Sequence, residues 1–287
     1  MRIGGATLIV LALVALAAPW LGTVDPTLFD AASRDLRPGQ AGEIMNLDGE
    51  TLHHVFLMGS DSFGRDIYSR VLYGTRVSLL VGMASATVAL FFGVLCGLAA
   101  GYLRWVDGLL MRVMDGVMAI PAILIAIALV ALWRASLGTV VMAIAIPEIP
   151  RVTRLVRSLV LSLREEPYVE AAVALGTPTG KILFGHILPN TLAPLIVQGT
   201  YIVGFAILTE AILSFLGVGL PPDIPTWGNI MAEGRVQFVD YPHNVFFPGV
   251  FLAVTVLAVN ILFHSLVERG WGAGHPQPGC CRIWSRP

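Results

Sequence analysis

Residues 77–102 read VSLLVGMASATVALFFGVLCGLAAGY and contain no Asp, Glu, Lys or Arg. A helix needs about 20 mostly apolar residues to cross the hydrocarbon core of a bilayer, and this run is longer. The run also exceeds the length of a membrane-barrel strand, and lipid offers no hydrogen-bond partner to an isolated sheet edge. The stretch therefore predicts a transmembrane helix.

Five further apolar runs accompany it, at about 5–21, 109–132, 137–149, 192–216 and 245–266. The composition agrees, because 56% of the 287 residues are hydrophobic and only 13% are charged. Together the runs predict an all-α membrane protein with about six transmembrane helices. The first run has an alternative interpretation as a cleaved signal peptide, since Arg2 precedes it and residues 15–17 are Ala-Leu-Ala.

Basic residues between the runs predict the orientation. Two flank the link between the second and third runs, and five fill the segment between the fourth and fifth: Arg104 and Arg112, then Arg151, Arg154, Arg157, Arg164 and Lys181. By the positive-inside rule both segments face the cytoplasm, so both chain termini are expected there as well. The segments 22–76 and 218–244, which hold most of the acidic residues, are then expected outside.

Several kinds of site are excluded. A formal net charge of -1 leaves no basic field for nucleic acid. Residues 176–181 read GTPTGK, but this is one residue too short between its glycines for a phosphate loop, and Ile182 stands where Ser or Thr would bind magnesium. His53 and His54 and the three cysteines, at 96, 280 and 281, lack metal-site spacing. We expect no catalytic residue, metal or cofactor in this chain.

Polar residues inside apolar runs are costly in lipid and often functional. Asp115 and Glu210 are candidates for a solute path, but the favoured interpretation is that Asp115 caps a cytoplasmic helix end and Glu210 pairs inside the bundle. Glycines recur every four residues in the second run, which predicts close helix packing. Prolines predict kinks in the third and fourth runs. These residues are Gly93, Gly97 and Gly101, and Pro121, Pro147 and Pro150.

The segment between the fourth and fifth runs predicts a helical hairpin outside the membrane. Residues 167–175 favour a short helix, Gly176 suits a left-handed C-terminal cap, and a second helix can start near Pro178 and stop before Pro189. Such a hairpin, carrying Glu170, is a candidate knob for a groove on another protein.

This segment resembles the EAA loop of membrane subunits in bacterial binding-protein-dependent ABC importers. The matching residues are Glu170, Ala171, Ala172 and Gly176, followed by Ile187, Leu188 and Pro189. Further stretches are similar to the second, C-type permease of the peptide and nickel branch: 59–70, 74–79, 112–115 with Pro121, 186–190, 208–217 and 225–228. The chain departs from that branch after Asn260, where 263–269 and 279–282 read FHSLVER and GCCR. The resemblance therefore implies no contacts for the C-terminal tail.

The resemblance implies a type I ABC importer permease of the bacterial inner membrane, with no enzymatic activity of its own. The seven EAA-like residues would couple it to two ATPase subunits, which would bind the ATP and Mg. A second permease subunit, forming a heterodimer, an extracytoplasmic solute-binding protein and membrane lipid would be its other partners. The solute would be a di- or oligopeptide, with nickel or another small solute as the alternative. A competing class is a channel or ion-coupled carrier without an ATPase, which would leave the hairpin without a purpose.

The resemblance divides the chain into three parts. Residues 1–75 would form an N-terminal helix and an extracytoplasmic segment, 76–268 the importer transmembrane domain with its loop at 167–190, and 269–287 an atypical tail. The outer segment would contact the binding protein through Asp61, Arg65, Asp66 and Arg70. Because Asp66 and Arg70 are spaced i, i+4, we expect a short amphipathic helix at the outer interface, which could equally rest on the membrane.

Overall fold

The structure is a computed structural model that describes residues 2–45 and 51–272. Most of the described chain is helical, with ten α-helices: α1 (Arg2–Ala17), α2 (Ile67–Tyr102), α3 (Arg104–Met118), α4 (Ala122–Leu132), α5 (Leu137–Leu163), α6 (Pro167–Ala174), α7 (Thr179–Ile182), α8 (Leu188–Phe215), α9 (Trp227–Gly234) and α10 (His243–Gly272). A π-helical segment, Leu183–Ile187, joins α7 to α8. The atypical tail from 273 onward, with Cys280 and Cys281, lies outside the described residues.

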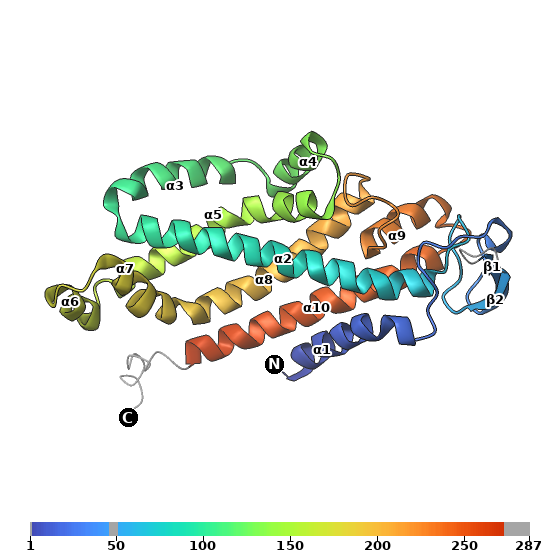
Figure 1. Ribbon diagram of the computed structural model, residues 1–287, viewed down its shortest axis with the longest axis horizontal. Helices are drawn as coiled ribbons and strands as arrows, with labels where there is room; N and C mark the ends of the chain where they lie inside the picture. The colour runs from blue at the N-terminus through green and yellow to red at the C-terminus, as the bar shows by residue number, and fades with distance from the viewer. Residues whose placement is uncertain (1, 46–50, 273–287) are drawn as a thin grey trace, which may run out of the picture.

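The helical fold agrees with the sequence prediction, and one small two-stranded sheet accompanies the helices. Strand β1 (Gln40–Met45) pairs antiparallel with β2 (Thr51–Phe56), with Ala41 opposite Val55. The sheet lies at one end of the molecule, beside the start of α2 and near α9, whereas α6 and α7 lie at the other end (Figure 1). We call these two regions the sheet end and the α6 end. The expected boundary at residue 75 falls inside α2, which runs continuously through it.

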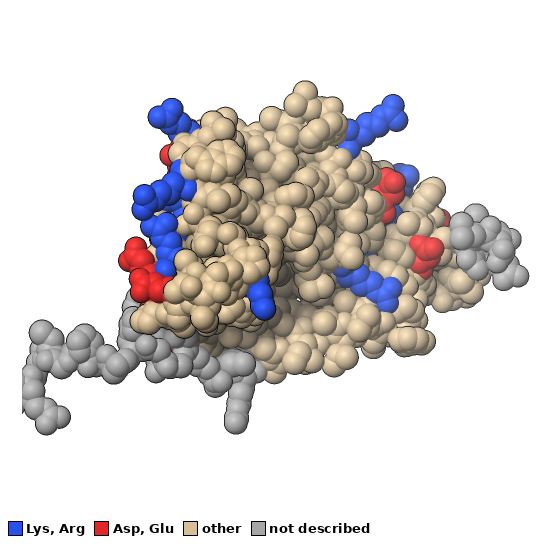
Figure 2. Space-filling model, turned by 60° about the vertical axis from the view of Figure 1, so that its left-hand side comes forward, with Lys and Arg blue, Asp and Glu red and all other residues tan. Residues whose placement is uncertain are grey.

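The long helices α2, α5, α8 and α10 run along the length of the molecule and connect the two ends, while α1 packs along α10 and covers only part of that length (Figure 1). On the face seen in Figure 2, most charged side chains lie toward the left and right margins, and the surface between them is largely uncharged. This distribution suits a bundle whose middle is surrounded by hydrocarbon.

The glycine repeat of α2 packs against a valine repeat of α5, as the spacing predicted. A Cβ atom added to any of the three glycines would lie 2.4 to 2.6 Å from a valine Cβ, closer than real atoms approach. The pairs are Gly93 with Val152, Gly97 with Val156 and Gly101 with Val160. Glycine therefore lets the two helix backbones approach each other.

All six apolar runs lie mainly in helices, but fewer than six helices are long and apolar enough to cross a membrane. Among the described residues there are three: α2, the continuous helix Thr179–Phe215, and α10 as far as Glu268. The pair α3 and α4 makes a fourth if it counts as one span bent by 87°. The break lies at Pro121, which confirms the kink predicted there. Length and composition leave out α1, which is short, and α5, which carries Glu148 and three arginines, although both pack along the long helices of the bundle.

Candidate functional site

Helix α6 forms the tip of the α6 end, as the sequence predicted. Pro167 occupies its first turn, where the missing N–H costs nothing, and Glu170 lies in the same turn, where the helix dipole favours an acid. Val169 and Ala172, three residues apart, are buried. The other face of the helix, with Glu170 and Ala171, is exposed to solvent.

Gly176 ends α6 in the predicted left-handed conformation, with a φ of 74°. Two hydrogen bonds close the cap: the Gly176 N–H donates to the Val173 carbonyl at 2.9 Å, and the Thr177 N–H donates to the Ala172 carbonyl at 3.0 Å. This pair of bonds defines a Schellman motif. A Cβ on Gly176 would meet nothing within 4 Å, so its backbone conformation, rather than a lack of space, is what favours glycine.

The second helix of the hairpin begins as predicted but does not stop before Pro189. Helix α7 starts directly after Pro178, and the chain continues through the π-helical segment into α8, with Pro189 in the first turn of α8. A proline ring normally clashes with the carbonyl four residues earlier. The wider π turn changes the spacing of the preceding carbonyls, so one helix continues from Thr179 to Phe215.

The EAA-like residues are brought together at the base of α6. Ile187 is fully buried in the same cluster as Val169, Ala172 and Ile182. Leu188 is half-buried, and Pro189 is exposed. The hairpin is thus packed on the bundle through one apolar cluster, while Glu170, Ala171 and Gly176 stay on its surface.

The outward surface of the α6 end combines apolar and acidic groups. Leu175 is 85% exposed, and Val173 and Phe184 are more than half exposed. Glu170, also exposed, lies three residues before Val173 on α6 and so shares its helix face. Exposed aliphatic and aromatic side chains next to a charge are typical of a surface that binds another protein.

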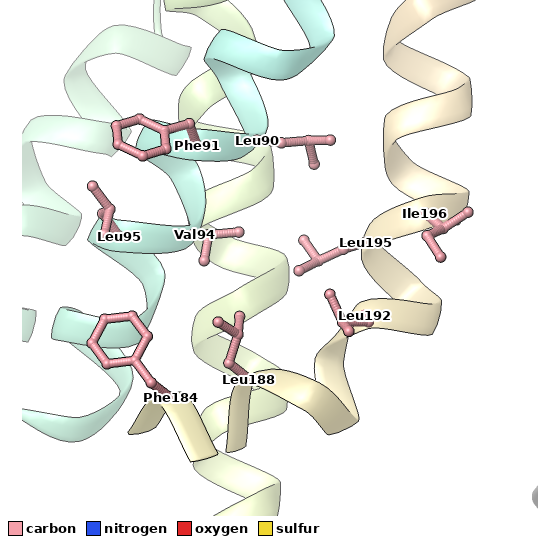
Figure 3. Close-up of a pocket in the computed structure, with 9 residues that line it drawn as sticks. All are labelled: Leu90, Phe91, Val94, Leu95, Phe184, Leu188, Leu192, Leu195 and Ile196. Atoms are coloured by element: carbon pink, nitrogen blue, oxygen red, sulfur yellow. The ribbon is translucent and has the colours of Figure 1, made fainter. Parts of the chain in front are cut away.

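A groove of about 400 Å³ lies between α2 and the start of α8. Leu90 and Val94 project from α2 toward α8, and Leu195 projects back toward them (Figure 3). Its lining is entirely apolar: Leu90, Phe91, Val94, Leu95, Phe184, Leu188, Leu192, Leu195 and Ile196. Without a polar group to orient a ligand, this groove suits hydrocarbon rather than a polar solute.

Asp115 lies in the last turn of α3, where its side chain pairs with another helix instead of capping a helix end. Its carboxylate accepts a hydrogen bond from Arg154 on α5 at 2.5 Å, and both side chains are exposed. Glu210, in α8, is fully buried and accepts a hydrogen bond from the Ser214 hydroxyl at 2.8 Å. Asp115 and Glu210 therefore have separate partners on different helices.

At the sheet end, three of the four residues expected to contact a binding protein form a buried cluster with Glu233. Arg70 Nη1 lies 2.6 Å from both Asp61 Oδ2 and Glu233 Oε2. Arg65 contacts the same two carboxylates, at 2.7 and 2.5 Å. We call Asp61, Arg65, Arg70 and Glu233 the four-charge cluster. Because these side chains face one another, they offer little exposed charge to a binding protein.

Asp66 corrects the expectation of a short amphipathic helix. It caps α2, accepting hydrogen bonds from the Ser69 backbone N–H at 2.9 Å and the Ser69 hydroxyl at 2.5 Å. Both Asp66 and Arg70 are 1% exposed, and they do not pair with each other. The i, i+4 spacing was misleading, because the partner of Arg70 across the fold, Glu233, is 163 residues away in the chain.

Sequence reasoning missed one polar group inside the bundle. Glu148, between the two prolines of α5, is fully buried, and Arg151 lies one turn further along the helix. The sequence did carry a signal, since an acid followed three residues later by an arginine is unusual in an apolar run.

Comparison with known proteins shows what the chain is similar to. A family model described as "binding-protein-dependent transport system inner membrane component" matches residues 89–269. A probable peptide ABC transporter permease protein of Sinorhizobium fredii is 48% identical over 264 residues, which cover 92% of this chain and 86% of the relative. A dipeptide transport system permease protein of Alkalihalophilus pseudofirmus is 48% identical over 221 residues, covering 77% and 72%.

Solved structures agree on the fold. An amino acid ABC transporter chain superposes with a TM-score of 0.53 at 15% identity, over 71% of this chain and 94% of that one. A chain of the MetNI methionine ABC transporter, in an inward-facing conformation, gives 0.51 at 18% identity, over 70% and 95%. At such low identity these matches bear on the fold alone.

Proposed function

The chain belongs to the family of inner-membrane components of binding-protein-dependent transport systems, and from this premise we propose that it forms part of an ATP-driven import path for di- and oligopeptides. It has the type I permease fold of ABC importers. The names of its relatives support a peptide as the solute. The observation that carries the proposal is the α6 end, where a capped helix presents Glu170 and exposed apolar side chains beyond the bundle.

The proposed role of the α6 end is coupling to two ATPase subunits, which bind ATP and Mg. Helix α6 would fit a groove on an ATPase, with the apolar residues Val173 and Leu175 buried on binding and Glu170 making a polar contact. Because the hairpin leads into one helix from Thr179 to Phe215, a displacement of α6 would tilt a helix that reaches the opposite end. In this role the chain would change conformation and would not itself catalyse a covalent reaction.

The remaining partners follow from the same family. A second, different permease subunit would complete the path, and an extracytoplasmic binding protein would deliver the solute to the sheet end. Both termini would lie in the cytoplasm with α6. The exposed surface of the sheet end, rather than the four-charge cluster, would meet the binding protein, since the charged groups of the cluster are already paired.

The test is to purify the tagged chain from its native membrane in mild detergent and to quantify its partners by mass spectrometry. The purified complex is then placed in proteoliposomes for uptake of the dipeptide Ala-Ala, with and without ATP. We expect two ATPase copies, a second permease and uptake that requires ATP. Recovery of the chain alone, with uptake that needs no ATP, would support a carrier and contradict the proposal.

A further inference from the structure

Glu148 has an unusual environment for a carboxylate. It is fully buried in α5, and in the part of the chain that the structure describes neither of its carboxylate oxygens has a hydrogen-bond partner. Burying such a group without donors is costly, and native proteins rarely retain one without a reason. The carboxylate therefore has unused capacity to accept hydrogen bonds.

Arg151 lies beside Glu148 and is held by three neighbouring groups. Its Nη1 is 3.4 Å from Glu148 Oε1, an ion-pair distance without hydrogen-bond geometry, and donates to the Tyr201 hydroxyl at 3.2 Å. The guanidinium carbon is 5.7 Å from the centre of the Phe205 ring. Both polar contacts, to the Glu148 carboxylate and the Tyr201 hydroxyl, use Nη1, so among the described residues the Nε and Nη2 groups of Arg151 keep donors for a further acceptor.

The position of this group in the fold limits what it can face. Arg151 lies near the middle of α5 (Leu137–Leu163), and its partner Tyr201 lies near the middle of α8 (Leu188–Phe215). The Arg151 side chain is 42% exposed. A guanidinium at such a depth is too costly to face hydrocarbon, and such residues usually face a water-filled path or another polypeptide.

We propose that Glu148 and Arg151 form a solute site for the two charged ends of a short peptide. The peptide ammonium supplies the donors that the Glu148 oxygens lack, and the peptide carboxylate accepts from the free donors of Arg151. Tyr201 and Phe205 position the guanidinium. This inference rests on the proposed function, because it takes the peptide as the solute and the space beside α5 and α8 as its path.

The inference also explains why both groups occur together. Arg151 Nη1 lies 3.4 Å from Glu148 Oε1, so that neither charge is isolated. A peptide carboxylate that binds the Arg151 guanidinium would draw the guanidinium away from Glu148. The Glu148 carboxylate would then be free to bind the peptide ammonium. A zwitterion is the solute that satisfies both groups at once, whereas an anion or a cation alone would leave one of them unpaired.

The experiment measures ATP-driven uptake by the complete reconstituted complex with three probes: Ala-Ala, N-acetyl-Ala-Ala and Ala-Ala-amide. For Arg151→Gln we expect about 10-fold slower uptake of Ala-Ala and no change for the amide. For Glu148→Gln we expect a similar loss for Ala-Ala and no change for the acetylated probe. A structural role would slow all probes equally and would overturn the inference.

Arg154→Gln is the matched control, because Arg154 has a similar exposed fraction on the same helix, 43%, but pairs with Asp115. It should carry Ala-Ala at the unaltered rate. If the unaltered complex transports neither N-acetyl-Ala-Ala nor Ala-Ala-amide, uptake of Ala-Ala by Arg151→Lys is measured instead. Retained uptake supports the site, and a loss equal to that of Arg151→Gln overturns it. Normal uptake in both Gln variants overturns this inference alone, whereas no uptake by the unaltered complex overturns the proposed function as well.

Discussion

The charged side chains of the four-charge cluster are buried and paired at the sheet end of the molecule, whereas charged side chains are exposed at the α6 end. At the sheet end, Arg70 is 1% exposed and contacts two carboxylates from separate parts of the chain. At the α6 end, Glu170 is exposed, and Leu175, at the C-terminal end of the same helix, keeps 85% of its surface accessible. The sheet end pairs the charges of the four-charge cluster with one another, whereas the α6 end leaves a charged group and apolar groups available to a partner.

This difference bears on how each end can move. The four-charge cluster ties the start of α2 to Glu233 in α9, and Asn229 of α9 donates to the Leu220, Pro221 and Ile224 carbonyls. Breaking one partner of a buried charge cluster is costly, so this end should move as one unit. The α6 end is packed on the bundle through one apolar cluster. A partner protein bound there could therefore displace it more easily than the sheet end.

The largest expected effect comes from Arg70→Met, which would leave Asp61 and Glu233 facing each other with Arg65 as their remaining cation. We expect a loss of about 3–5 kcal/mol in the free energy of unfolding. Thermal unfolding of the purified chain in detergent measures it. The matched control is Arg154→Met, whose pair with Asp115 is exposed and should be worth no more than about 1 kcal/mol. Equal losses in the two variants would contradict the contrast between buried and exposed charge.

A smaller effect is expected at the cap of α6. Gly176→Ala would force a side chain into the left-handed region, at a cost of about 1–2 kcal/mol. Gly180→Ala is the control, because a Cβ there also meets nothing within 4 Å and α7 has ordinary helical geometry. Hydrogen exchange of the α6 amides should become roughly 10-fold faster in the first variant and stay unchanged in the second. Unchanged exchange in both variants would show that the cap does not depend on glycine.

The features of the α6 end were predictable because they depend on neighbouring residues. Pro167, Gly176 and Pro178 each obey a local rule for starting or ending a helix, and the glycine repeat of α2 follows from a fixed spacing. Pro189 was the exception at this end. The usual proline rule assumes an α-helix, and the π turn before it removes that assumption.

The sheet end was largely unpredictable for the opposite reason. Its charged residues were identified, but their partners are set by the tertiary fold, as in the Arg65 and Glu233 pair, which joins residues 168 positions apart. The strands β1 and β2 were missed as well, since their residues do not show a clear alternation of polar and apolar side chains. Glu148 was missed because the run at 137–149 was assigned as a membrane helix from its overall apolar composition, without weighing the single acid inside it.

The most direct test of the account compares Glu170→Gln at the α6 end with Asp240→Asn at the sheet end, two exposed acids whose loss should change stability by less than about 0.5 kcal/mol. The measurement is capture of the ATPase subunits by the purified chain, titrated with ATPase. We expect roughly 10-fold weaker capture for Glu170→Gln and unaltered capture for Asp240→Asn. Equal capture by the two variants would contradict the assignment of the α6 end as the coupling surface.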